Sequence, residues 1–511
     1  MTVALLFALA LQGKDRVPQE PLRQAELRVF DQQTNELLCE LKAREATPGA
    51  GGSISIVDPL ATLYTRDSER VLHKFEVRAA RATYDPTTQR LKAEGKVRIT
   101  SPEGVSFAAD AALVDLKKQR VETEDAFRLA KPGVEILGTG LAGRLDMSEG
   151  RIVRDGQITI FGDPREALSR DPTPDPAPGR TILRGVGPMR FQEEGKKLSV
   201  SISKGVNVLR EDSNGILTAK GGSAELEGAR DASGAIRIDR LDLSGGIEMA
   251  DSRDGRAEGD RLSLAGDVVR VSAARGCAVA FGSNEIFAKE IAVDRVRGWV
   301  EARGNPRART EAGAEISARE IDLTLAPVEK RWEIRTLQAR GSVEARREGV
   351  RIVAPLVAIR GRSTMFVSGP KLLRFDADGK THTATCRGDA RIAQDALDLE
   401  GDAFLSGPDV RMSADRILAA RGEDGKLKWV LGRGAVRLTS RTKDGETAAA
   451  FGREVRAVGS AIQIRAEPEA MLVTKDRRVW AAEILLDRET GRFSARGGDR
   501  PARMRVLSAP R

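Results

Sequence analysis

The apolar residues of this chain recur at every second position, in runs of four to eight residues, from about Phe75 onward. Arg, Lys, Asp, Glu, Ser and Thr fill the positions between them, which is the pattern of a strand with one buried face. Helical periodicity is nearly absent. Clear examples of the alternation are Val97/Ile99, Ile158/Ile160, Leu198/Val200/Ile202, Val206/Val208 and Ile462/Ile464. The pattern predicts an all-β fold of many short antiparallel strands.

Two short phrases recur along the chain and indicate a repeat. The first is Gly-x-(Val/Ile/Ala), which we expect to open a strand, as at Gly95-Lys96-Val97, Gly246-Ile247, Gly341-Ser342-Val343, Gly388-Asp389-Ala390 and Gly434-Ala435-Val436. The second is Ala-x-x-apolar-x-apolar, as at Ala109–Asp115, Ala288–Asp294, Ala318–Leu323, Ala414–Leu418 and Ala481–Asp487. A single hairpin cannot bury its apolar face alone, so the repeat predicts stacked hairpins.

Prolines gather in one segment, with Pro164, Pro172, Pro174, Pro176 and Pro178 close together. Proline removes ladder donors and stiffens the chain, so residues 163–180 are predicted to be a linker. This divides the chain into β regions at residues 20–162 and 181–511.

The N-terminus carries a short apolar run, Val3–Leu11. It is shorter than the roughly twenty residues that span a bilayer, but it has the length of the apolar core of a secretory signal. Residues 1–13 are therefore predicted to be a signal peptide or a clipped signal anchor. The alternative is an N-terminal core segment of a cytoplasmic protein, because Met1 and Thr2 supply no positive charge before the run.

Composition excludes several classes of function. The chain has 14 Phe, 2 Tyr and 4 Trp, too few aromatic residues for the stacking platforms of nucleic acid binders, although its net charge is +9. Its two histidines and three cysteines are widely separated, so they form no recognisable zinc site, disulfide framework or catalytic triad. We expect no metal, no cofactor and no enzymatic activity.

Residues 72–147 resemble the OstA-like family of lipopolysaccharide transport proteins, which includes the periplasmic bridge proteins LptC and LptA. The phrases that carry the resemblance follow in the family's order: Ala80–Asp85, Leu91–Ile99, Phe107–Asp110, Val121–Thr123 and Gly138–Leu141 before Leu145-Asp146. With the preceding segment that contains Glu26–Asp31, this half is similar to LptC, and residues 180–511 carry looser copies similar to LptA. The chain is much longer than either single bridge protein.

The resemblance implies an elongated antiparallel β-jellyroll with a hydrophobic groove, through which lipid acyl chains pass, and with open edge strands for head-to-tail joining. The groove candidates are the inward residues Val97, Ile99, Phe107, Ile158, Ile160, Val200, Ile202, Val206 and Val208. The candidates for assembly edges are Leu27 and Val29 at one end and Leu472 and Val473 at the other. Alternation alone is equally compatible with an ordinary filled β core.

The leading hypothesis is a non-enzymatic periplasmic bridge, with or without an attachment to the inner membrane, that carries lipopolysaccharide or another acylated glycolipid. Its expected partners are other bridge components of the Lpt type, an ABC transporter complex, an outer-membrane barrel of the OstA type and further copies of itself. One alternative is a structural β-solenoid or surface protein with a filled core. Another is a polysaccharide hydrolase or lyase, although no paired carboxylates stand out.

Arginines on the polar strand faces allow two interpretations. They are solvated strand faces, or they contact phosphates of the glycolipid. The residues concerned are Arg295, Arg297, Arg303, Arg307 and Arg309.

Overall fold

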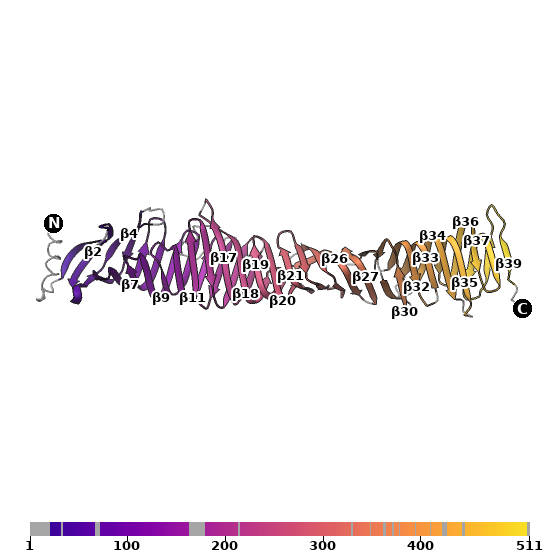
Figure 1. Ribbon diagram of the computed structural model, residues 1–511, viewed down its shortest axis with the longest axis horizontal. Coiled ribbons are helices and arrows are strands. Elements are labelled where there is room, and N and C mark those ends of the chain that lie inside the picture. The colour runs from indigo at the N-terminus through magenta and orange to yellow at the C-terminus, as the bar shows by residue number, and fades with distance from the viewer. Residues whose placement is uncertain are drawn as a thin grey trace. The chain divides into compact units, whose positions relative to one another are not determined.

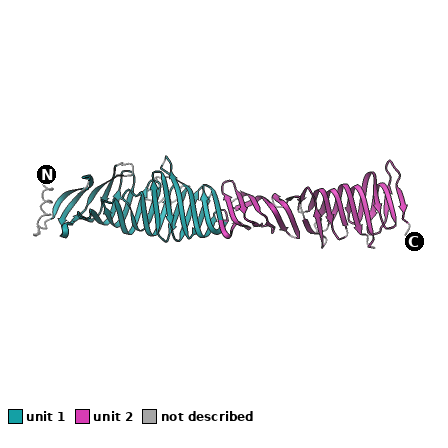
Figure 2. Ribbon diagram, in the orientation of Figure 1, with its two compact units in different colours: residues 1–252, 256–271 teal, residues 253–255, 272–511 magenta. Residues whose placement is uncertain are grey.

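The computed structural model describes residues 21–31, 34–66, 72–162, 179–212, 215–232, 234–328, 331–347, 349–360, 364–369, 372–377, 379–393, 395–408, 410–421, 427–441 and 445–507. The chain divides into two compact units, which Figure 2 colours separately. Unit 1 comprises residues 1–252 and 256–271, and unit 2 comprises residues 253–255 and 272–511.

Unit 1 is built of antiparallel strands that follow one another along the chain (Figure 1). They are β1 (Leu22–Phe30), β2 (Leu37–Pro48), β3 (Ile54–Val57), β4 (Leu60–Arg66), β5 (Leu72–Arg78), β6 (Arg81–Asp85), β7 (Arg90–Thr100), β8 (Ser106–Asp115), β9 (Arg120–Lys131), β10 (Val134–Arg144), β11 (Glu149–Ile160), β12 (Arg180–Gly185), β13 (Met189–Glu194), β14 (Lys197–Ile202), β15 (Val206–Asp212), β16 (Gly215–Gly221), β17 (Ser223–Arg230) and β18 (Ile236–Asp251). Strands β19 (Gly255–Ala265) and β20 (Val268–Phe281) contribute residues to both units.

Unit 2 repeats this construction. Its strands are β21 (Asn284–Asp294), β22 (Trp299–Arg303), β23 (Arg307–Arg309), β24 (Glu315–Ser317), β25 (Glu320–Val328), β26 (Arg331–Arg347), β27 (Val350–Arg360), β28 (Thr364–Ser368), β29 (Leu372–Ala377), β30 (Lys380–Thr385), β31 (Asp389–Ile392), β32 (Ala396–Ser406), β33 (Val410–Arg421), β34 (Leu427–Arg441), β35 (Thr447–Val458), β36 (Ala461–Val473), β37 (Arg477–Asp487), β38 (Phe493–Arg496) and β39 (Arg503–Val506). The described residues contain no α-helix, and the only helical turn among them is the 3-10 turn Ala50–Gly52. The all-β antiparallel prediction is confirmed.

The longer strands bend in the middle, and each half has different partners. In β7, residues 90–94 pair with β6, whereas residues 98–100 pair with β5. The register of β7 against β8 shifts at the bend, between Glu94 and Val97. Through such bends the strands of unit 1 form two layers. Layer A contains β4, β5, β12, β15, β16 and the halves of β7 to β11 that continue them, and layer B contains β3, β6, β13, β14, β17 and the other halves.

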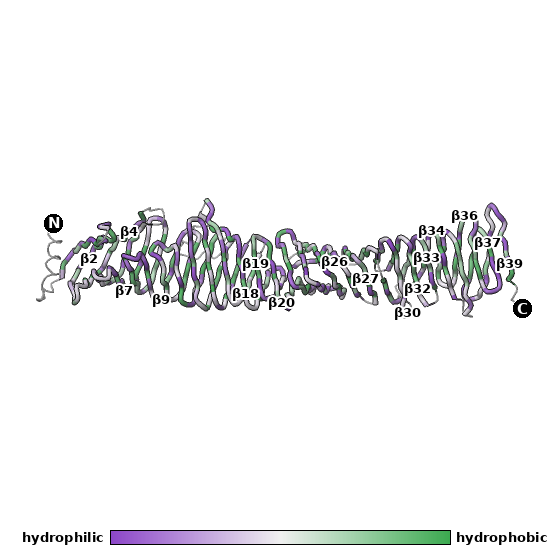
Figure 3. The backbone as a smooth tube through the Cα atoms, viewed as in Figure 1, coloured by the Kyte–Doolittle hydropathy of each residue, from purple (hydrophilic) through white to green (hydrophobic). Residues whose placement is uncertain are grey.

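The apolar faces of the two layers meet each other. An added Cβ at Gly138 or Gly185 in layer A would lie 2.5 Å from Ile152 or Ile202 in layer B, so the layers touch there. Along each strand, apolar and polar residues alternate, as the colours in Figure 3 show. The apolar set therefore lies between the layers, and the polar set lies outside.

The bends explain the first repeated phrase, and they correct its placement. Gly388 immediately precedes β31, as expected, but Gly95, Gly341 and Gly434 lie inside β7, β26 and β34, at the bend. Gly95 has a φ of +82°, which costs most residues strain, and its missing Cβ would lie 2.8 Å from the Cβ of Ala80. At Gly434 the Cβ would meet Asp415, which belongs to the second phrase Ala414–Leu418 on the neighbouring strand. At this bend, the glycine of the first repeated phrase therefore lies against a residue of the second repeated phrase on the neighbouring strand.

The predicted division at residues 163–180 is wrong. Strand β11, before the Pro-rich segment, pairs with β12 after it and also with β13, so both flanks belong to the ladder of unit 1. Prolines remove ladder donors only within their own segment, and the flanking strands keep theirs. The observed division lies instead near residues 253–271. The predicted signal segment at residues 1–13 and most of the predicted linker lie outside the described residues.

Candidate functional site

The nine groove candidates all lie on the buried face of unit 1, each at most 3% exposed. Layer A contributes Val97, Ile99, Phe107, Ile158, Ile160, Val206 and Val208, and layer B contributes Val200 and Ile202. Ile99 stands opposite Phe107, whose ring stacks on Phe127 at 6.1 Å between centroids. The predicted inward orientation is confirmed, and the role of these residues in lipid binding stays a prediction.

The interior at these nine positions is filled by side chains. The hollow of about 630 Å³ in unit 1 is lined equally by polar residues such as Arg184 and Lys220 and by apolar residues such as Ile182 and Met249, and of the nine candidates only Val208 borders it. An acyl chain that enters between the layers must therefore move side chains aside or part the layers. Because the contacts in such an interior are only dispersion and hydrophobic contacts, another apolar group can replace a displaced side chain with little loss of contact energy.

The predicted N-terminal edge agrees with the strand pairing. Leu27 and Val29 lie on β1, which pairs only with β2 among the described residues. The other side of β1 presents backbone N–H and C=O groups that can accept a further strand. That this edge pairs with a strand of another molecule remains a prediction.

The predicted C-terminal edge is wrong. Leu472 and Val473 lie on β36, which pairs with β35 on one side and β37 on the other, and Leu472 is fully buried. Beyond them the chain forms β38 and β39, each paired only with β37 among the described residues. The sequence signal for β39 is the brief alternation Arg503-Met504-Arg505-Val506, too short to stand out from the flanking loop. Met504 and Val506 are 59% and 68% exposed.

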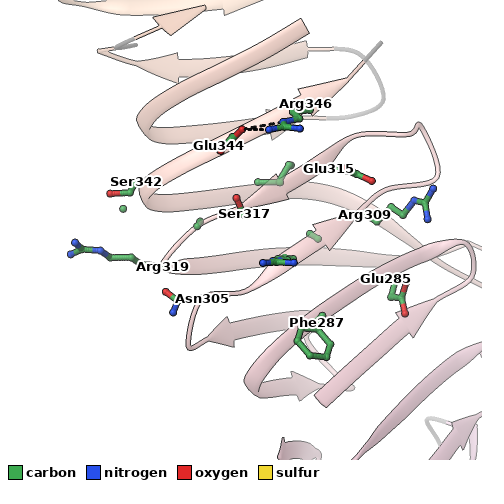
Figure 4. A pocket seen from close by; sticks show the side chains of 15 residues that line it. Glu285, Phe287, Asn305, Arg309, Glu315, Ser317, Arg319, Ser342, Glu344 and Arg346 are labelled. Carbon is green, nitrogen blue, oxygen red and sulfur yellow. Dashed lines mark hydrogen bonds and ion pairs between the residues drawn. The ribbon is translucent and has the colours of Figure 1, made fainter. Parts of the chain in front are cut away.

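A hollow of about 850 Å³ lies at strands β21, β23, β24 and β26 of unit 2, and Figure 4 shows its lining. Its lining includes Arg307 and Arg309, two of the arginines that the sequence assigns either to a solvated strand face or to a phosphate contact. Across four strands, Glu285, Arg309, Glu315 and Arg346 stand directly opposite one another in that order. Opposite charges in adjacent strands stabilise a sheet face, so this row favours the solvated-face interpretation for Arg309. For Arg295 that interpretation is wrong, because Arg295 follows the end of β21 and is only 4% exposed.

A buried charge cluster in unit 1 is absent from the sequence predictions. Lys131, at the end of β9, donates from Nζ to a carboxylate oxygen of Glu193 on β13 and to the carbonyl of Met147 at 3.2 Å. Arg230, at the end of β17, donates from Nε and Nη2 to the other oxygen of Glu193 at 3.0 and 2.9 Å. These residues are far apart in sequence, and no local pattern links them.

The electrostatics of the cluster favour an ionised carboxylate. Burial raises the pKa of Glu193, but the charges and hydrogen bonds of Lys131 and Arg230 lower this pKa more, and the net shift is downward. The side chains of Lys131, Glu193 and Arg230 are 7%, 14% and 20% exposed, so little water screens them. Two cations therefore share one carboxylate at a position that is largely shielded from solvent.

The cysteines are enclosed rather than reactive. Cys39, Cys277 and Cys386 are buried, and burial raises the pKa of Cys39 to about 12 and that of Cys277 to about 11. A thiol needs a lowered pKa and exposure to act as a nucleophile. Within the described ranges, no three His, Cys, Asp or Glu side chains are grouped to hold a metal ion. The same residues include no helix that is long and apolar enough to cross a membrane.

Comparison with known proteins gives a family model that matches part of the chain. The family model described as lipopolysaccharide-assembly, LptC-related, matches residues 12–155, which include β1 to most of β11. Among solved structures, the chain is similar to LptH, the LptA-homologous periplasmic component of the lipopolysaccharide transport device of Pseudomonas aeruginosa. The identity is 13%, the match covers 25% of this chain and 95% of LptH, and the TM-score is 0.22. A search of curated proteins gives no match.

Proposed function

We propose, from the LptC-related domain at residues 12–155, that this chain is a non-enzymatic periplasmic component of lipopolysaccharide transport. Its fold would be an OstA-like jellyroll, and its cargo would be lipopolysaccharide or a related acylated glycolipid. The observation that carries the proposal is the apolar interior between layers A and B, which continues through the matched residues into β12–β17.

The energetics of such an interior suit an acyl chain. Transfer of a chain of about twelve carbons from water into an apolar interior gains on the order of 10 kcal/mol before entropic costs, at about 0.8 kcal/mol per CH₂. This gain must exceed the cost of displacing residues such as Phe107 and Ile158, which fill the interior when no lipid is bound. Passage along the layers then exchanges one apolar contact for another, with no net burial to lose.

The free edges suit a bridge. Strand β1 at the start of the described chain and strands β38 and β39 near its end each have one unpaired side among the described residues. Strand addition at these edges would join other Lpt-type bridge components, an ABC transporter complex, an outer-membrane barrel or a second copy of this chain. In this proposal the exposed Met504 and Val506 lie at one joint.

A second function is favoured by one observation. Because all nine groove candidates are buried by other side chains, the interior also fits a structural β protein with a permanently filled core. The two functions differ in whether lipid ever contacts the inner face.

Photo-crosslinking separates them. A small diazirine side chain at Ile99 or Val200, both on the inner face, should capture lipopolysaccharide in cells. The matched control is Arg98, the exposed neighbour of Ile99 on β7. Adducts from Ile99 and Val200 but not from Arg98 support transport. If no inner position yields a lipid adduct while the protein is folded and periplasmic, the filled-core function is correct.

A further inference from the structure

The bent strands bring both of their ends to one side of unit 1, where the turns of layer A face the turns of layer B. Strand β10 shows this, because its first half lies in layer A, its second half lies in layer B, and Gly140 marks the bend. The turn before β10 contains Pro132 and Gly133, and the turn after it contains Met147. We call this side the turn margin. It is where the interior between the layers would open.

The charge cluster crosses the turn margin in both directions. Lys131 extends from layer A to the Met147 carbonyl and to Glu193 in layer B. Arg230 extends from layer B to the Pro132 carbonyl in layer A at 2.6 Å, and it also donates to the Gly234 carbonyl at 2.7 Å. Each cation thus donates to at least one group on the side opposite its own layer. The apolar residues Val134 and Ile136 on β10 and Phe191 on β13, the strand that carries Glu193, are buried.

This arrangement is complementary to an anionic amphiphile. Apolar chains would lie between the layers, and an anionic headgroup would lie at the margin, where two cations already converge on a carboxylate. Phosphate is the anion that such a Lys and Arg pair binds best, since it accepts several charge-assisted hydrogen bonds. We propose that Lys131 and Arg230 form a headgroup site for the phosphate of an acylated glycolipid, and that Glu193 occupies this site as an internal anion until the phosphate replaces it.

The proposal rests on the proposed function and specifies its ligand. It also accounts for the presence of buried charges at this position, because a buried ion pair is seldom more stabilising than apolar residues of similar size. Replacement of Glu193 by phosphate would release the ion pair that ties Lys131 in layer A to Glu193 in layer B. Arg230 lies in the same layer as Glu193 and would keep its bond to the Pro132 carbonyl of layer A. Headgroup binding would then loosen the turn margin at Lys131.

The test measures binding of the full-length chain to lipid A with both sugar phosphates and to the same lipid after phosphate removal. We expect the wild-type chain to prefer the phosphorylated lipid about tenfold, as one charge-assisted hydrogen bond implies. Lys131→Met and Arg230→Gln should abolish that preference and leave binding of the dephosphorylated lipid unchanged. Glu193→Gln should instead increase affinity for the phosphorylated lipid, because it removes the competing anion.

The opposite signs separate recognition from mere support of the fold, which would move all three variants in the same direction. Arg128→Gln is the matched control, since Arg128 lies on the same strand and pairs with Glu135 at an exposed position. Circular dichroism of each variant checks that the β content is retained. If the wild-type chain binds both lipids equally, or Glu193→Gln and Lys131→Met change affinity in the same direction, the headgroup site is refuted and transport stands. If the chain binds neither lipid, both proposals fail.

Discussion

The bend of β7 supports a stringent test, because two glycines with the same backbone angle differ in their surroundings. Gly95 at the bend and Gly52 in the 3-10 turn both have a φ of +82°. A Cβ at Gly95 would lie 2.8 Å from the Cβ of Ala80, whereas a Cβ at Gly52 would meet only Pro86, at 3.9 Å. We therefore expect Gly95→Ala to destabilise the protein more than Gly52→Ala.

The magnitude follows from two contributions. Alanine in the left-handed region costs about 1–2 kcal/mol, and this applies equally to both positions. At Gly95 the methyl group also approaches well inside the optimal carbon–carbon separation of about 3.5–4.0 Å, and overpacking of this kind costs roughly 1–3 kcal/mol. The strand cannot simply move away, because the Gly95 carbonyl accepts the Ala80 N–H at 2.9 Å. The expected difference between the variants is thus about 1–3 kcal/mol.

Urea unfolding, followed by circular dichroism in the β region, measures this difference as a shift of the midpoint at constant slope. Gly52→Ala serves as the control for backbone strain alone. Equal losses of stability in the two variants would mean that close approach at the bend is not the reason for glycine there, and the account of the repeated phrase would be wrong.

Three further predictions follow from the site and the edges. The folded-state pKa of Glu193 is lowered, so the stability that Glu193 contributes is present above the unfolded pKa of about 4.3 and is lost as pH falls through the folded pKa. Acid unfolding monitored by circular dichroism should therefore be less pH-dependent in Glu193→Gln. Val506→Asp on β39 should weaken association in sedimentation experiments while the β content is retained. Leu472→Pro changes a fully buried residue on an interior strand, so it should lower the free energy of unfolding by about 3 kcal/mol or more and reduce the β content. Equal loss of structure in both variants would contradict the assignment of the edge to β39. With a pKa of about 12, Cys39 should resist a thiol reagent at pH 8 until the chain unfolds, and rapid labelling of the native protein at Cys39 would show that this burial is wrong.

Alternation was sufficient to predict which residues face inward, because side chains in a strand point to opposite faces in turn. Val97 and Ile99 are examples, and both are fully buried. The same pattern did not reveal that Val97 stands just after a bend, since a register shift between Glu94 and Val97 resumes the alternation on the next layer. Strand length and strand pairing were therefore less predictable than burial.

The features that sequence reasoning missed depend on distant partners. Lys131 contacts Glu193, 62 residues away, and Glu193 contacts Arg230, 37 residues away. Leu472 was placed at an edge because it lies in one of the last clear alternating runs, yet the short strands β38 and β39 follow it. A four-residue strand has too few positions for periodicity to identify it.

The pairing of β11 with β12 across a proline-rich insertion shows that this architecture tolerates added chain at its turns. Each strand bonds only to its immediate neighbours, so stability accumulates locally, as in a one-dimensional array. A lineage can consequently lengthen such a protein by duplicating whole hairpins, provided that every new bend carries its glycine and every new inner face its apolar residues. Chain length then becomes a quantity that selection can adjust, with no redesign of the chemistry inside.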